Sequence, residues 1–152
     1  GKVEELSIED IESQMQTNYF GMINCTKYFL PHFLKQNFGH MVNVASVGGS
    51  FGVPGIASYC ATKFAVAAFT EGLRQELSVR KNIRVTSIEP GVVQTELTNT
   101  ITEQSLQAFV DKHKEMEGLQ AEDISNAIIF ALEAPNHMNV NEILIRPTTQ
   151  EV

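Results

Sequence analysis

Tyr59 and Lys63 lie four residues apart in a segment with helical periodicity, and their side chains are suited to proton transfer. At 3.6 residues per turn, this spacing places both side chains on one face of a helix. A phenol with a pKa of about 10 is a poor base at neutral pH, but a cation about 4 Å away lowers that pKa by up to about three units at an effective dielectric constant near 20. The same spacing also occurs in solvated surface pairs, so the pair by itself is a weak signal.

The elements that position this pair alternate between helices and strands. A helical pattern over 58–80 carries Tyr59 and Lys63, and it lies between two short apolar runs, 41–46 and 82–88, that are typical of buried strands. A long amphipathic helix begins at a capping-box-like pair, Ser7 and Asp10, and Pro31 predicts a kink in it. The remaining patterns predict marginal helices between Thr102 and Glu117, a helix over 121–134 and a strand over 142–145.

This order favours βαβ units, a parallel sheet and right-handed connections. In such sheets ligands bind beyond the carboxyl ends of the strands. Ser46 and the Pro90-Gly91 turn both follow predicted strands, so we expect them at the edge where ligands bind.

The composition narrows the classes of function. With 18 acidic and 11 basic residues and a net charge of −7, the chain lacks the charge expected for binding nucleic acid or an anionic membrane. Its two cysteines and four histidines show no metal-ligand spacing. We expect one domain over 1–152, no metal, no membrane partner and a cytoplasmic location.

Four segments together resemble the short-chain dehydrogenase/reductase family. Asn43-Val44-Ala45-Ser46 is followed, thirteen positions after Ser46, by Tyr59-Cys60-Ala61-Thr62-Lys63, and then by Ile88-Glu89-Pro90-Gly91-Val92-Val93-Gln94-Thr95. The upstream Thr17-Asn18-Tyr19-Phe20-Gly21 is similar to the Asn-x-x-Gly helix motif of that family. Four motifs in the right order are far more specific than any one of them.

The resemblance implies a catalytic set made of Asn18, Ser46, Tyr59 and Lys63. Tyr59 would be the general acid or base towards a carbonyl or alcohol oxygen, and Ser46 would hydrogen-bond that oxygen. Lys63 would lower the pKa of Tyr59 and bind the nicotinamide ribose, and Asn18 would hold a water in a proton relay. The activity implied is hydride transfer between NAD(P)(H) and a carbonyl or secondary alcohol.

The resemblance also implies contacts with cofactor and substrate. Cofactor contacts would come from Tyr59, Lys63, Pro90, Gly91, Val93 and Thr95. Substrate contacts would come from Ser46, Tyr59 and Gln94, and also from Leu97 and Phe109 of a variable lid over 96–118. The cofactor would be NADP or NAD, and the tail 142–150 resembles NADP-preferring members.

The glycine-rich phosphate loop of the family has no counterpart in these 152 residues. We therefore expect an α/β fold that is a partial, Rossmann-like, doubly wound parallel sheet, the C-terminal catalytic portion of the family's fold, assembled as a homo-dimer or homo-tetramer. Two alternatives stay open. One is a non-catalytic or truncated binding relative, and the other is an epimerase or dehydratase of the extended branch.

Overall fold

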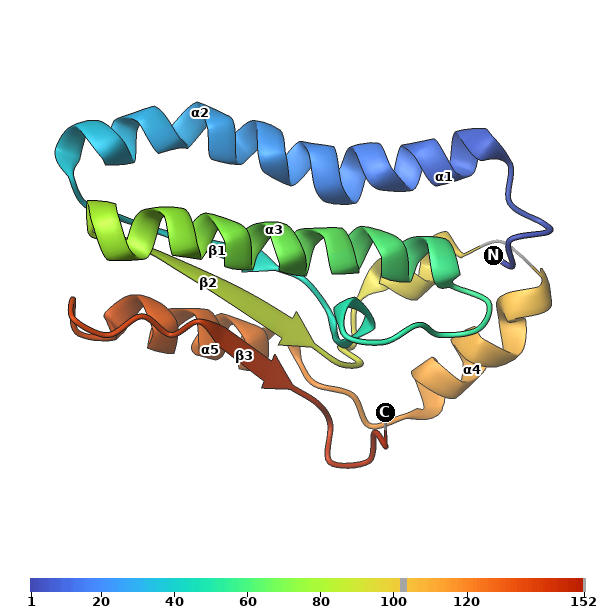
Figure 1. Ribbon diagram of the computed structural model, residues 1–152. Helices are drawn as coiled ribbons and strands as arrows, with labels where there is room; N and C mark the ends of the chain where they lie inside the picture. The colour runs from blue at the N-terminus through green and yellow to red at the C-terminus, as the bar shows by residue number, and fades with distance from the viewer. Residues whose placement is uncertain (102–103, 152) are drawn as a thin grey trace.

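The computed structural model describes residues 1–101 and 104–151 as helices packed on a parallel sheet (Figure 1). Two residues of the predicted marginal helices, Thr102 and Glu103, lie outside the described residues. In chain order the principal elements are α1 (Ile8–Met15), a π-helical turn (Gln16–Phe20), α2 (Gly21–Gln36), β1 (Gly39–Val44), α3 (Ala57–Lys81), β2 (Ile83–Pro90), α4 (Gln107–Glu115), α5 (Ala121–Glu133) and β3 (Glu142–Ile145).

The strand order is β1-β2-β3, and both pairings are parallel. Val44 at the end of β1 pairs with Ile88, and Pro90 at the end of β2 pairs with Ile145 at the end of β3. The carboxyl ends of these strands therefore meet at one edge. The predicted strands are confirmed, with the correction that β1 ends at Val44 and leaves Ser46 in the loop that follows it.

The two faces of β2 are covered by different helices. Ile83 and Val85 pack with Leu73 and Leu77 of α3 in the buried core. The guanidinium of the intervening Arg84 donates instead to the carbonyl of Ala134, directly after α5. Because successive side chains of a strand point to opposite faces, α3 and α5 lie on opposite sides of the sheet (Figure 1). The sheet is doubly wound, as expected.

This arrangement corrects the expectation that the connections are right-handed. Both connections step in the same direction across the sheet, from β1 to β2 and from β2 to β3, but their helices lie on opposite faces. The two connections therefore have opposite hands, and one departs from the rule. The rule assumes a helix that follows its strand directly, whereas residues 91–120 separate β2 from α5.

The first helix begins as the sequence predicts. Ser7 Oγ accepts a hydrogen bond from the Asp10 backbone N–H (3.1 Å), and the Asp10 carboxylate accepts one from the Ser7 N–H (3.0 Å). Pro31 lies inside α2, which continues to Gln36, and the irregular part of the long helix is the π-helical turn at Gln16–Phe20. That turn contains Asn18.

Between β2 and α5 the chain forms short helices, Glu96–Thr100, Gln104–Leu106 and α4. An isolated parallel β-bridge pairs Val93 with Leu119 and so joins the beginning and the end of this segment. Among the described residues, no helix has the length and apolar character needed to cross a membrane.

Candidate active site

Ser46 and Tyr59 lie together at the carboxyl edge of the sheet. After β1 the Ala45 N–H donates to the Ile88 carbonyl (2.8 Å), and Ser46 then caps a short 3-10 helix, Val47–Gly49. Ser46 Oγ accepts a hydrogen bond from the Gly48 N–H (3.1 Å) and donates a long one to the Pro90 carbonyl (3.5 Å). The Ser46 side chain also lies close to the Tyr59 ring, since a Cβ atom at Gly48 would meet Ser46 Oγ and Tyr59 Cε1 at 3.5 Å each.

Lys63 lies one turn of α3 after Tyr59, on the side of β1. Its ammonium donates to the Val44 carbonyl (3.2 Å) and lies 5.8 Å from the centroid of the Tyr59 ring. The helix thus presents both side chains to the end of β1, as the four-residue spacing predicts.

The pKa of Tyr59 shifts upward in this structure, whereas a downward shift was expected from Lys63. Burial raises the pKa of Tyr59 above its ordinary value of 10.0; the nearby Ser46 hydroxyl opposes this rise and the neighbouring Cys60 adds to it. Burial also lowers the pKa of Lys63. The lysine is directed to a backbone carbonyl, so desolvation, which disfavours both charged forms, has the larger influence in this structure.

Asn18 contacts the same helix from the π-helical turn. Its Nδ2 donates to Thr62 Oγ1 (3.0 Å), and Thr62 Oγ1 in turn donates to the Tyr59 carbonyl (2.7 Å). Thr62 is fully buried. Asn18 therefore bonds to α3 rather than to its own local backbone, and π-helical turns often occur at functional sites. Sequence reasoning quoted Thr62 within the motif around Tyr59 but gave it no role.

The Pro90-Gly91 turn is held by the C-terminal segment. The Gly91 N–H donates to the Ile145 carbonyl (2.7 Å), and the Val92 N–H donates to Gln150 Oε1 (2.9 Å). Gln150 was missed as a site residue by sequence reasoning. The available signal was its place in a polar tail directly after β3.

The hydrogen bonds of the Gln94 and Thr95 side chains, and the β-bridge of Val93, lie within the segment between β2 and α5. Val93 forms the bridge with Leu119, Gln94 Nε2 donates to the Met116 carbonyl (2.7 Å), and Thr95 Oγ1 accepts from the Leu97 N–H (3.3 Å). The side chain of Leu97 is 61% exposed. Gln94 is therefore held by its own segment, and substrate contact by Gln94 and Leu97 stays a prediction.

Another predicted lid residue, Phe109, stacks on the ring of His113 with 3.9 Å between ring centroids. His113 Nδ1 is also within 2.8 Å of the Phe109 carbonyl, so the two residues form a local unit of α4. Substrate contact by Phe109 stays a prediction.

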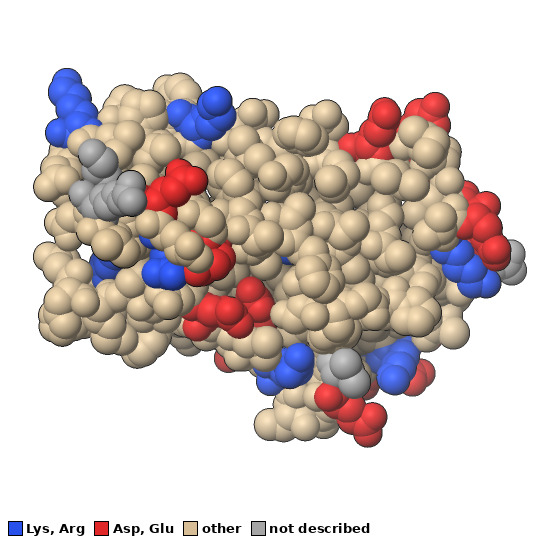
Figure 2. Space-filling model, viewed as in Figure 1, with Lys and Arg blue, Asp and Glu red and all other residues tan. Residues whose placement is uncertain are grey.

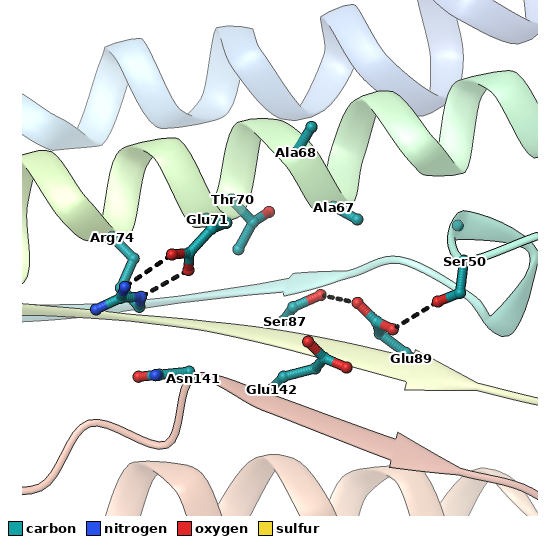
Figure 3. A pocket seen from close by; sticks show the side chains of 11 residues that line it. Ser50, Ala67, Ala68, Thr70, Glu71, Arg74, Ser87, Glu89, Asn141 and Glu142 are labelled. Atoms are coloured by element: carbon teal, nitrogen blue, oxygen red, sulfur yellow. Dashed lines mark hydrogen bonds and ion pairs between the residues drawn. The ribbon is translucent and has the colours of Figure 1, made fainter.

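A cavity of about 330 Å³ lies between α3, β2 and β3, beside the site and without Ser46, Tyr59 or Lys63 in its lining (Figure 3). The buried carboxylate of Glu89 accepts hydrogen bonds from Ser87 (3.0 Å) and Ser50 (3.4 Å), and burial raises its pKa. Glu89 thus links β2 to the loop that follows Ser46. Within 1–101 and 104–151, no three His, Cys, Asp or Glu side chains form a group that could hold a metal ion.

Charge is distributed without a large patch on the face shown in Figure 2. Lys and Arg side chains are interspersed with Asp and Glu in small groups, and much of this face is uncharged. That distribution offers no continuous basic track for a phosphate backbone on this face.

Comparison with known proteins identifies the family. The short chain dehydrogenase family model matches residues 1–106, which include Asn18, Ser46, Tyr59 and Lys63. The chain belongs to the short chain dehydrogenase family. The family predicted from the four motifs is confirmed, and the curated relatives of this family member are named oxidoreductases.

Two of these relatives are uncharacterized oxidoreductases of staphylococci. The chain is 40% identical to one from Staphylococcus saprophyticus over 150 residues, covering 97% of the chain and 61% of the relative. It is 37% identical to one from Staphylococcus epidermidis, covering 96% of the chain and 59% of the relative. The chain therefore spans about three fifths of the length of the curated relatives that it matches.

Solved structures confirm the fold class. A closed form of serine dehydrogenase complexed with NADP+ superposes with a TM-score of 0.90 at 33% identity, covering 99% of this chain and 61% of that one. Serine dehydrogenase from Escherichia coli gives a TM-score of 0.81 at 31% identity, covering 99% of this chain and 59% of that one.

Proposed function

We propose that this short chain dehydrogenase forms the catalytic portion of an oxidoreductase that transfers hydride between NAD(P)(H) and a carbonyl or secondary alcohol. The observation that carries the proposal is that the Ser46 and Tyr59 side chains lie side by side at the carboxyl edge of the sheet, with the Lys63 ammonium 5.8 Å from the Tyr59 ring centroid. A donor pair of this kind matches the needs of a carbonyl oxygen that gains negative charge.

The proton chemistry falls to the chain's own side chains. In the reducing direction Tyr59 gives its hydroxyl proton to the substrate oxygen, while Ser46 Oγ donates a hydrogen bond to that oxygen. In the oxidising direction Tyr59 takes the proton. Burial raises the pKa of Tyr59, which favours the protonated phenol that the reducing direction requires.

The residues present fit a nicotinamide cofactor, which would supply or accept the hydride. A lysine ammonium has three N–H donors, and Lys63 directs one of them to the Val44 carbonyl. The other donors are available to the hydroxyls of a ribose. Tyr59, Lys63 and the Pro90–Thr95 segment would hold the nicotinamide end, and NADP is favoured because the serine dehydrogenase neighbour is complexed with NADP+.

The rest of a dinucleotide site would lie across the free edge of β1. Among the described residues β1 pairs with β2 alone, and an apolar groove lined by Met22, Phe29, Phe33 and Val42 runs along its other side. Val44 is 47% exposed at that edge. An open parallel edge with an apolar groove is the surface on which further strands of an α/β sheet pack.

We further propose that the protein acts on a small molecule in the cytoplasm as a homo-dimer or homo-tetramer. The exposed side of α3 supports self-association, since Phe64 is 44% exposed and a methyl group at Gly72 would meet open space. Small residues allow helices to pack closely. Light scattering that finds a monomer would remove this part of the proposal.

Cofactor binding and turnover by the full natural protein test the proposed function. We expect NADPH or NADH fluorescence to shift on binding, and we expect at least one carbonyl compound in a panel of ketones, aldehydes and keto acids to be reduced. Binding of neither cofactor would contradict the proposal. Binding without turnover across the panel, in both reaction directions, would favour a non-catalytic relative.

A further inference from the structure

The turn after β2 and the end of the chain form one hydrogen-bonded unit. After β3 the chain turns back at Pro147, where the Gln150 N–H donates to the Pro147 carbonyl (3.0 Å) (Figure 1). This turn brings the Gln150 side chain to the Val92 backbone N–H, with 2.9 Å between donor and acceptor. The side chain is thus hydrogen-bonded to a peptide 58 residues earlier in the chain.

The same side chain occupies the space beside the Cα atom of Gly91, so a larger residue at position 91 would require Gln150 to move. A Cβ atom at Gly91 would lie 2.1 Å from Gln150 Oε1 and 3.2 Å from Arg146 Cγ. Both distances are shorter than ordinary van der Waals contact. The space that a side chain at position 91 would fill therefore belongs to the tail, and Gly91 and Gln150 fit each other as a pair.

The other side of the same loop is also held. The Val92 carbonyl accepts a hydrogen bond from the Leu119 N–H (2.9 Å), and the Gln94 N–H donates to the Leu119 carbonyl (2.8 Å). Residue 92 is therefore bonded at its N–H by Gln150 and at its carbonyl by Leu119. Two bonds on opposite sides restrict rotation of this part of the loop.

We propose that Gln150 is a positioning residue that sets the orientation of the loop 91–95 at the active site. The loop begins at Pro90, whose carbonyl contacts Ser46, so its orientation affects the edge where the nicotinamide would bind. This inference rests on the proposed function, because a positioning role has meaning only where the loop receives a cofactor. Misplacement of a binding loop by about 1 Å is enough to change rates strongly.

The test uses three variants of the full natural protein. Gln150→Met keeps the length of the side chain but removes the oxygen that accepts from Val92, Gln150→Glu keeps an acceptor oxygen, and Thr149→Ala alters an exposed neighbour as a control. We expect Gln150→Met to raise KM for the nicotinamide cofactor about tenfold and to leave KM for the carbonyl substrate within about twofold. Gln150→Glu should restore the cofactor KM to within about threefold of wild type.

Hydrogen exchange at the Val92 amide provides a readout that needs no activity. We expect this amide to be protected in wild type and in Gln150→Glu and to exchange at least about tenfold faster in Gln150→Met. Unchanged cofactor KM in Gln150→Met, or equal defects in Met and Glu variants, would overturn the positioning role. If Val92 exchanges as expected but the wild-type protein binds neither cofactor, the proposed function fails and the positioning role fails with it.

Discussion

The two ends of β2 make different use of their polar groups. At the amino end, Arg84 donates to the carbonyls of Ala134 (2.7 Å) and Leu132 (3.0 Å) at the end of α5. At the carboxyl end, the Ser46 and Tyr59 side chains lie side by side, and burial disfavours ionisation of Tyr59. Polar groups at the first end complete the fold, whereas those at the second keep donors and a proton for a ligand.

Asn139 provides hydrogen-bond partners for the backbone at the amino end of β2. Its side-chain amide makes two hydrogen bonds with the backbone of Val85: Oδ1 accepts one from the N–H and Nδ2 donates one to the carbonyl, both 3.0 Å long. β3 begins only at Glu142 and pairs from Ser87 onwards. A side chain therefore replaces the missing strand partner of Val85, as buried backbone groups require. Variants at this end should change stability, and variants at the other end should change activity.

The largest effect among the variants that separate the two ends is expected for Ser46→Ala. Removing the hydroxyl that stabilises the substrate oxygen should lower kcat/KM about 100-fold, equivalent to about 2.7 kcal/mol. The unfolding free energy should change by no more than about 1 kcal/mol, because only neutral hydrogen bonds are lost. Steady-state kinetics and urea unfolding measure the two quantities. Ser46→Thr, which keeps the hydroxyl, is the matched control. An equal loss of kcat/KM in the Ala and Thr variants would show that the Ser46 hydroxyl takes no part in the chemistry.

Arg84→Met should show the opposite pattern. It removes charged hydrogen bonds that cap the carbonyls at the end of α5, and we expect the unfolding free energy to fall by about 2 kcal/mol. Turnover per folded molecule should stay within about twofold of wild type. Urea unfolding measures the first quantity, and turnover normalised by active-site titration measures the second. A tenfold loss of turnover in folded protein would contradict the assignment of stability to the amino end of β2 and activity to its carboxyl end.

Asn18→Ala should produce a smaller loss of activity. It removes the hydrogen bond from Asn18 to Thr62 Oγ1, the hydroxyl that itself donates to the Tyr59 carbonyl. We expect kcat to fall about tenfold. Thr62→Val removes the same bond from the other side. If the two groups act as one unit, the double variant will be no slower than the slower single variant, whereas additive losses would indicate separate roles.

The smallest effect concerns His40 at the amino end of the β1–β2 pair. Thr86 Oγ1 donates its proton to the Val140 carbonyl (2.6 Å), so it accepts the bond from His40 Nε2 (2.7 Å), and the buried Nδ1 carries no proton. Burial, with a contribution from the Arg84 charge, lowers the pKa of His40 from 6.5 to about 4.

This shift has a defined consequence for stability. Between pH 6.5 and about 4 the unfolded chain binds a proton at His40 that the folded chain does not, so stability falls as the pH decreases through this window. After allowance for solvent screening at a half-buried site, the loss is about 1 kcal/mol. Chemical unfolding of wild type and His40→Gln at pH 7 and pH 4.5 measures it. Equal pH dependence in the two proteins would contradict this role.

Local patterns predict much of this molecule, and long-range packing determines the rest. The period of apolar residues identifies α3 and α5, and the four-residue spacing correctly places Tyr59 beside Lys63. The family follows from motif order and is confirmed. The predicted hand was wrong for one connection, because it depends on which face of the sheet α5 covers after the 30 residues that separate it from β2.

Two features of the site were also beyond sequence reasoning. The pKa of Tyr59 depends on burial that no spacing reveals, so the expected lowering by Lys63 did not include the opposing desolvation. Gln150 meets Gly91 only because β3 and the turn at Pro147 bring the tail back. A glycine before a loop predicts a close approach but does not identify what approaches.

Proton transfer by Tyr59 is tested by the kcat of Tyr59→Phe in the full natural protein, together with cofactor affinity and unfolding free energy. The variant keeps the ring that fills the site and removes only the proton carrier. The account predicts a loss of about 10³-fold or more in kcat, with cofactor affinity within about threefold and nearly unchanged stability. A variant that keeps kcat within about tenfold of wild type would contradict proton transfer by Tyr59.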